Sequence, residues 1–138
     1  MITALIDTNV VLDYAEKREG FFDVAEKMFV QMWQGSFVGF VSASAVTDIY
    51  FFLKKRYKDT GIAISLLKML LDALDVLAVD RKTIETAIES DMTDFEDAVQ
   101  AAAAQNFGID IVVTRDKTGY QNSGLHVYSP EEFLESLK

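Results

Sequence analysis

The apolar residues of this chain gather in short runs that do not alternate regularly with polar residues. These runs, bounded by polar or turn-forming residues, are 3–6, 37–41, 75–79, 109–114 and 125–128. Continuous apolar character over so few residues is typical of strands covered on both faces, as in parallel sheets. Helical segments lie between the runs, so right-handed crossovers are expected. The sequence predicts an α/β fold, a Rossmann-like three-layer α/β/α sandwich with a mostly parallel central sheet.

The intervening segments carry helical periodicity and helix-boundary signals. Helices are expected after Asn9 to about residue 17, over 24–33, 60–73, 81–89 and 93–108, and from Pro130 onward. In the fifth of these, Thr93 and Glu96 fit a capping box. The stretch 46–53 remains open, because its residues favour a strand while its length favours a helix.

Composition limits the classes of protein that remain. A chain of 138 residues, half of them apolar, suits one domain over 1–138. No cysteine and a single histidine, His126, exclude thiol chemistry and weigh against zinc. The N-terminus reaches Asp7 before a signal or membrane segment could form, so a cytoplasmic protein without a membrane partner is expected.

The net charge of −9 argues against charge-driven binding of nucleic acid. Screening makes this objection partial, because a local basic strip acts independently of distant charges. Candidate cations are Lys54, Lys55, Arg56, Lys58, Arg81, Lys82, Arg115 and Lys117. Solvated helix ends explain each of them equally well.

Acidic residues recur where a parallel sheet places its ligands. Asp7 and Asp116 follow predicted strands, and Asp97 lies in the first turns of a helix that precedes one. Ligands bind beyond the carboxyl ends of such strands. Asp48 is the only charge between residues 37 and 53, where a buried carboxylate needs a donor, a cation or water. The set therefore predicts a crevice of carboxylates that a hard divalent cation would neutralise, Mg²⁺ or Mn²⁺.

Each acid also has a purely structural interpretation. Asp7 or Asn9 can cap the first helix, and Asp116 can serve as a turn residue. Asp94 can occupy the first helical position, one turn before Asp97 and on the same face. Asp48 has the weakest structural alternative, and the site hypothesis depends on the whole set.

Four motifs along the chain resemble those of the PIN domain family, the metal-dependent ribonuclease fold that includes VapC-type toxins of toxin–antitoxin pairs. They are Leu5-Ile6-Asp7-Thr8-Asn9, Ser42 followed by Asp48, the segment Asp94-Phe95-Glu96-Asp97-Ala98, and the segment Ile111 to Asp116. The third is the most specific and is similar to a subgroup with an Asp-Phe-Glu-Asp-Ala opening. The resemblance favours a helix over 46–53.

The chain departs from the family pattern at two of these motifs. Asp48 stands where the family more often has Glu. Many members continue after the fourth motif to an Asp-Phe pair, where this chain has Gly119 and Tyr120. Asp116 must therefore supply the fourth carboxylate alone.

The resemblance implies hydrolysis of RNA phosphodiester bonds with one or two Mg²⁺ or Mn²⁺ ions. Asp7, Asp48, Asp97 and Asp116 would be the catalytic and metal-binding residues, and Asn9, Asp94 and Thr114 would support them. Arg115 and Lys117 would steer the RNA backbone. An antitoxin partner and a homodimer are expected, the latter through Trp33, Tyr50, Phe51 and Phe52 unless these are core. The alternative is a PIN-like protein- or RNA-binding module with little or no turnover.

Overall fold

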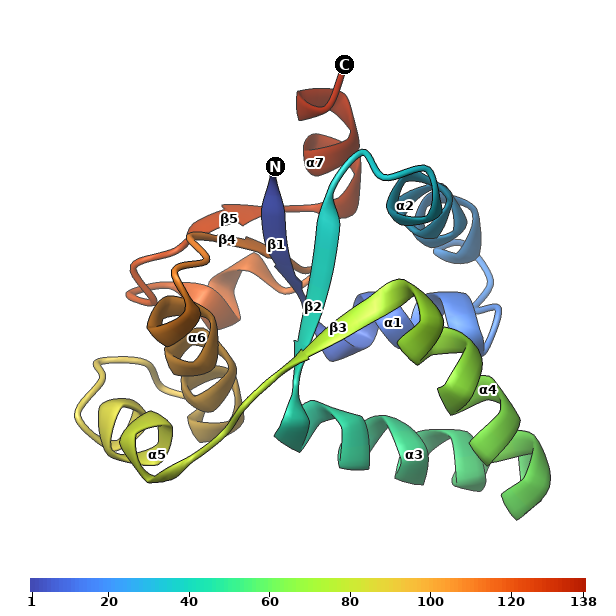
Figure 1. The fold of residues 1–138 in the computed structure, drawn as a ribbon, viewed down its shortest axis with the longest axis horizontal. Coiled ribbons are helices and arrows are strands. Elements are labelled where there is room, and N and C mark those ends of the chain that lie inside the picture. Colours follow the sequence, from blue (N-terminus) through green and yellow to red (C-terminus); the bar gives the residue numbers. More distant parts are fainter.

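The computed structural model describes all 138 residues and contains one five-stranded sheet. Its strands are β1 (Thr3–Ile6), β2 (Val38–Ser42), β3 (Leu74–Leu77), β4 (Ile111–Val113) and β5 (His126–Tyr128). They run in the order β3-β2-β1-β4-β5, and all four pairings are parallel. The predicted α/β architecture is confirmed, with a sheet that is entirely parallel (Figure 1).

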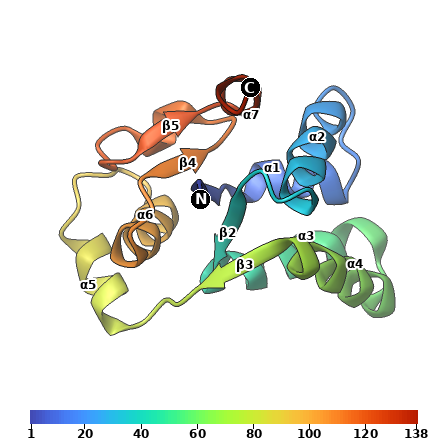
Figure 2. The ribbon, with the colours of Figure 1, turned by 45° about the horizontal axis from the view of Figure 1, so that its top comes forward.

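Helices cover both faces of the sheet (Figures 1 and 2). They are α1 (Thr8–Ala15), α2 (Phe22–Trp33), α3 (Ala43–Tyr57), α4 (Thr60–Ala73), α5 (Arg81–Ile88), α6 (Phe95–Phe107) and α7 (Pro130–Ser136), with a 3₁₀ turn η1 (Lys117–Tyr120). None combines the length and apolarity needed to cross a bilayer.

Two hydrophobic cores lie against the sheet, and a third cluster of four buried residues lies between α5 and α6. The larger of the two sheet cores packs α1, α2, α3, α4 and α7 against one face, and the smaller packs α6 against the other. Successive residues of β1 alternate between them, with Leu5 in the smaller core and Ile6 in the larger. The alanine run of α6 lets that helix approach the sheet closely, because alanine side chains occupy little space.

The ambiguous stretch 46–53 belongs to helix α3. Ser42 caps this helix by accepting a hydrogen bond from the Ala45 amide at 3.1 Å. Ala45, Ile49 and Leu53, spaced by four, are buried on one side. The bulky β-formers that suggested a strand include Phe51, which is 67% exposed. Periodicity therefore prevails over strand propensity.

Two local expectations were wrong. Helix α6 is capped by Asp94, whose carboxylate accepts from the Asp97 amide at 2.9 Å. Thr93 is therefore outside the helix, no capping box forms with Glu96, and Asp94 is not the first helical residue. The 3₁₀ turn over Lys117–Tyr120 was not foreseen.

Candidate active site

Strands β1 and β4 meet where the chain reverses its direction of travel across the sheet. From central β1 the chain adds β2 and β3 on one side and later β4 and β5 on the other. Beyond the carboxyl ends of such a pair lies the crevice in which α/β proteins bind ligands. Here the Asp7 amide donates to the Val113 carbonyl at 3.0 Å, which joins the two strand ends directly.

Four aspartates line a depression of about 360 Å³ at this place. Asp7 follows β1, Asp94 and Asp97 stand at the start of α6, and Asp116 follows β4. The other lining residues are Thr8, Asn9, Leu12, Arg18 and Phe52. The structure thus brings together three of the four predicted catalytic carboxylates and adds Asp94.

The carboxylate of Asp7 is buried and held by four donors. Its Oδ1 accepts from the Thr8 amide at 2.8 Å, the Tyr120 hydroxyl at 3.3 Å and Gln100 Nε2 at 3.5 Å. Its Oδ2 accepts only from the Thr114 hydroxyl, at 2.7 Å. Burial outweighs these donors and raises the pKa of Asp7 above its ordinary value. Oδ2 keeps one lone pair free for a ligand.

Asp97 is the opposite case, because its half-buried carboxylate accepts no hydrogen bond from the protein. Desolvation, together with the nearby charges of Asp7, Asp94 and Asp116, raises the pKa of Asp97 to about 7. A bound cation would remove this penalty, since it favours the ionised form.

Asp94 and Asp116 are exposed, and each uses one oxygen to cap a turn. Oδ1 of Asp116 accepts from the Gly119 amide at 3.2 Å, as Oδ1 of Asp94 does from Asp97. A methyl group added at Gly119 would lie 2.8 Å from Oδ2 of both Asp97 and Asp116. The two oxygens therefore border the same small space, which exists because residue 119 has no side chain.

Asp48 does not line the depression. It lies on the adjoining side of Gln100, in a separate pocket with Phe95 and Glu96. Its charge is also absent from those that raise the pKa of Asp97. The structure therefore does not gather Asp48 with the other three carboxylates; helix α3 presents it to the neighbouring pocket.

Two predicted supporting residues lie at the depression in different ways. Thr114 donates to Asp7, and its oxygen accepts from the Asp116 amide at 2.9 Å, so one hydroxyl links two of the acids. Asn9 touches no carboxylate; its side-chain oxygen accepts from the Arg115 amide at 3.5 Å.

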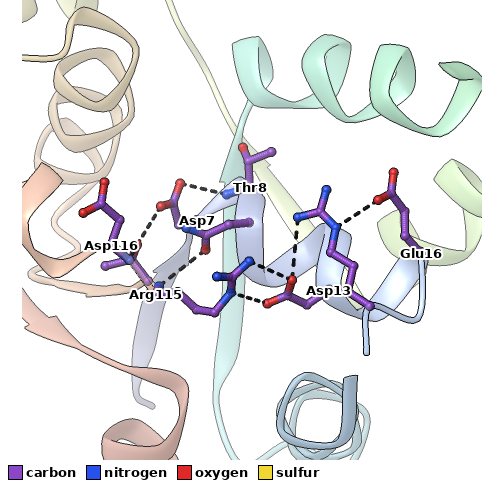
Figure 3. Close-up of polar contacts among 9 residues, drawn as sticks. Asp7, Thr8, Asp13, Glu16, Arg115 and Asp116 are labelled. Carbon is purple, nitrogen blue, oxygen red and sulfur yellow. Dashed lines mark hydrogen bonds and ion pairs between the residues drawn. The ribbon is translucent and has the colours of Figure 1, made fainter. Parts of the chain in front are cut away.

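The two cations predicted to steer RNA are engaged in ion pairs. Arg115 binds the carboxylate of Asp13, which is 1% exposed, through two bonds of 2.7 and 3.1 Å (Figure 3). Its guanidinium also lies 3.8 Å from the ring centre of Phe21. Lys117 pairs with Glu132 at 2.9 Å on the surface. Arg115 thereby anchors the segment that carries Asp116, and its contact with RNA stays a prediction.

Five site residues were not identified from sequence: Asp13, Arg18, Phe52, Gln100 and Tyr120. Arg18 is the only cation that lines the depression, and it pairs with Glu16 at 2.9 Å. Gln100 could have been found, because it is the lone polar residue amid Ala98 to Ala104 and lies one turn after Asp97. Tyr120 was noted only as a departure from the family pattern.

The potential metal ligands of the depression suit a hard divalent cation. All are carboxylate oxygens, which Mg²⁺ and Mn²⁺ prefer. Asp97 has no hydrogen-bond donor, and Oδ2 of Asp116 is also free. In the side-chain conformations described, no three acidic or histidine side chains close around one point. The residue types therefore fit a metal ion, and their side chains are spread around the depression without meeting at a single position.

Residues 3–118 match the family model described as PIN domain. The chain belongs to the PIN domain family. It is 27% identical over 139 residues to "Ribonuclease VapC1" of Aquifex aeolicus, with 94% of this chain and 92% of that protein covered.

Solved structures show the same fold at low identity. The structure of DNA-bound VapBC from Salmonella typhimurium is similar with a TM-score of 0.70 and 15% identity, covering 94% of this chain and 99% of that one. PAE2754 from Pyrobaculum aerophilum is similar with a TM-score of 0.66 and 20% identity, covering 99% and 89%.

Proposed function

We propose that this single-domain chain is a metal-dependent endoribonuclease and the toxin of a toxin–antitoxin pair, acting on RNA in the cytoplasm. The observation that carries the proposal is Asp97, a half-buried carboxylate that accepts no hydrogen bond and lies among three other acids. Desolvation first, and then the charges of these acids, raise its pKa to about 7. Such an arrangement is unfavourable for an empty surface and favourable for a cation site. The similarity to a ribonuclease over nearly the whole chain supports the reaction class.

Asp7, Asp97 and Asp116 would hold one or two Mg²⁺ or Mn²⁺ ions, with Asp94 at the rim. When bound, the ion lowers the pKa of a water molecule and neutralises charge that develops on the scissile phosphate. Thr8, Thr114, Tyr120 and Gln100 keep Asp7 in one orientation, and its Oδ2, which accepts from Thr114 alone, keeps a lone pair free.

Repulsion of RNA by the four acids must be overcome before any reaction. Helices α1 and α6 both begin at this depression, and their positive ends partly offset the carboxylate charge. Arg18 is the cation of the chain best placed to meet a phosphate oxygen, because it lines the depression and is only part-buried.

Cleavage of a labelled RNA is the direct test. We expect cleavage with Mg²⁺ or Mn²⁺, none with excess EDTA, and recovery when the ion is restored. Asp7→Asn and Asp97→Asn should abolish cleavage while circular dichroism stays unchanged. Asp48→Asn tests the remaining sequence prediction, that Asp48 reaches an ion through water. Wild-type turnover in the Asp7 or Asp97 variant would refute the mechanism.

A protein- or RNA-binding module without turnover is the second candidate, because no three acids close around a point in this structure. Thermal unfolding with increasing Mn²⁺ separates the two functions. If the site binds metal, the midpoint of thermal unfolding should rise, because the ion binds the folded protein. If the site does not bind metal, the midpoint should stay unchanged.

An antitoxin would cover the depression with a segment that presents a cation to these acids. VapBC, the protein of the Salmonella typhimurium structure, is described as bound to DNA.

Phe51, Phe52 and Trp33 are exposed by 67%, 47% and 49%, so they are not core and remain available for a homodimer. Light scattering of the purified chain, with Phe51→Ala as the comparison, tests that assembly.

A further inference from the structure

A second pocket of about 280 Å³ adjoins the acidic depression. It lies between the start of α6, the start of α3 and the segment around Val79 and Ile84, and has an apolar wall of Val79, Ile84 and Val99. The side chain of Gln100 separates the two spaces: its Nε2 is 3.5 Å from Asp7 Oδ1, and the same residue lines the pocket. A group seated here would be next to Asp7.

The pocket is lined by an aromatic side chain and hydrogen-bond acceptors, and by no cation. Phe95 is 52% exposed although it is a large apolar residue. Asp48 and Glu96 supply two carboxylates that make no hydrogen bond within the protein. The nearby hydroxyls are occupied, since Ser44 bonds Ser42 at 3.0 Å and Thr47 donates to the Ser44 carbonyl at 2.8 Å.

One polar atom beside this pocket has no partner. Gln100 is 6% exposed, and its Oε1 is the only buried side-chain nitrogen or oxygen atom in the protein that makes no hydrogen bond. A buried acceptor left unpaired costs about 1 to 3 kcal/mol, and such groups need an explanation. Because Gln100 lines the pocket, a rotation of its amide toward the N–H donors of a ligand seated there would give this oxygen a partner.

We propose that this pocket holds one base of the RNA, next to the scissile phosphate, and that it prefers guanine. Single-stranded RNA is recognised by stacking unpaired bases on aromatic side chains and bonding their edges. Phe95 offers the stacking face, and the carboxylates accept from the edge. Guanine presents two adjacent donors, N1–H and the N2 amino group, which match the two oxygens of one carboxylate. Adenine and cytosine offer an amino group beside an acceptor, and uracil offers a single N–H between two acceptors.

The placement links base and phosphate without any movement of the backbone. Phe95 lies between Asp94 and Asp97 in the first turn of α6, so the stacking face and the metal-site acids are held by one rigid element. The apolar wall excludes water from the bonded edge, which strengthens the bonds to the base. The inference rests on the proposed ribonuclease function, since that function makes RNA the ligand.

Binding of short RNAs tests the pocket separately from cleavage. Four 5′-labelled octamers of uridine, with guanosine, adenosine, cytidine or uridine at one central position, are titrated with protein and followed by fluorescence anisotropy. Ca²⁺ replaces Mg²⁺ to supply the charge, and gels establish that the probes stay intact. A fifth probe with inosine lacks only the N2 amino group.

We expect the guanosine probe to bind about tenfold more tightly than the uridine probe, with inosine between them, because one well-formed base contact is worth roughly 1 to 3 kcal/mol. Phe95→Ala should weaken the guanosine probe by about tenfold. Phe107→Ala is the matched control, an exposed aromatic at the other end of α6 that lines neither space, and should change nothing. Glu96→Gln should remove the guanosine preference while leaving the uridine probe unaffected.

Equal affinity for all probes, absence of binding to any probe, or equal loss in the Phe95 and Phe107 variants would each overturn the proposed base pocket. Failure of the proposed function has a different signature, since it would show as no cleavage of any probe with Mg²⁺ or Mn²⁺. A guanosine preference in anisotropy without cleavage would therefore support the pocket and count against the enzyme.

Discussion

Replacing Asp97 with asparagine should stabilise the metal-free protein and at the same time remove its response to metal. Asp97 ionises only as pH rises through about 7, because partial burial, and then repulsion from Asp7, Asp94 and Asp116, raise its pKa. Asparagine has nearly the same shape and no charge. The substitution therefore relieves the repulsion and deletes the carboxylate with the most to gain from a cation.

The magnitude follows from the pKa of Asp97, which rises from 3.8 to about 7. A shift of that size corresponds to roughly 4 kcal/mol, and screening of a half-exposed group reduces it to about 1 to 2 kcal/mol. Because the folded protein holds the proton more tightly than the unfolded chain, the contribution of Asp97 to stability is fully present below pH 3.8 and is lost as pH rises to about 7. The advantage of the variant should grow over the same range.

Thermal unfolding measured between pH 5 and 8.5 in EDTA tests this directly. At pH 8 the variant should melt about 3 to 8 °C above the wild type, and at pH 5 the difference should be much smaller. With Mn²⁺ at 100 times its dissociation constant, the wild type alone should gain about 2.7 kcal/mol. The order of the two melting points should then reverse.

Asp72→Asn is the matched control, because Asp72 is an exposed carboxylate of α4 outside the depression. It should shift neither the pH dependence nor the metal response. The reasoning is wrong if the Asp97 variant is less stable than the wild type in EDTA at pH 8, or if Mn²⁺ stabilises both equally.

Three further substitutions probe the groups around the acids. Gly119→Ala should weaken Mn²⁺ binding about tenfold in calorimetry without unfolding the protein, since its methyl group occupies the space between two carboxylates; unchanged affinity would contradict this. Tyr120→Phe removes a donor that lowers the pKa of Asp7, so the acidic limb of the cleavage–pH profile should move to higher pH, and an unmoved limb would count against it. Arg115→Ala leaves Asp13 buried without its main partner and should cost about 3 kcal/mol in urea unfolding, with Arg115→Lys rescuing poorly; a loss of RNA binding without loss of stability would favour the steering function instead.

The fold was predictable because its signals are local and repeated. Short apolar runs identify buried strands, and helical spacing between them fixes the crossovers, so sheet type follows. The boundaries were less accurate: β4 covers only Ile111–Val113 of the expected 109–114. The 3₁₀ turn after Asp116 has no periodicity to reveal it, because it is a single turn held by a capping carboxylate.

The site was predictable only to the extent that strand ends determine it. Asp7 and Asp116 follow adjacent strands, and the parallel sheet brings them together whatever the loops do. Which pocket Asp48 faces depends on the rotation of α3 about its axis. Packing of Ala45, Ile49 and Leu53 decides this rotation, and the local sequence does not. Of the donors to Asp7, Gln100 is marked by its polarity among alanines, whereas nothing in the local sequence marks Tyr120 as a donor.

The contrast between Asp7 and Asp97 predicts how metal binding should couple to protons. Asp7 is held by four donors, whereas Asp97 has none and a pKa of about 7. A cation must displace the proton of Asp97, so at pH 6 binding should release close to one proton from this group and at pH 8.5 almost none. Calorimetry of Mn²⁺ binding in two buffers of different ionisation enthalpy measures this number. Equal proton release at both pH values would mean that the cation does not displace a proton from Asp97. Metal binding would then depend on the other acids of the depression.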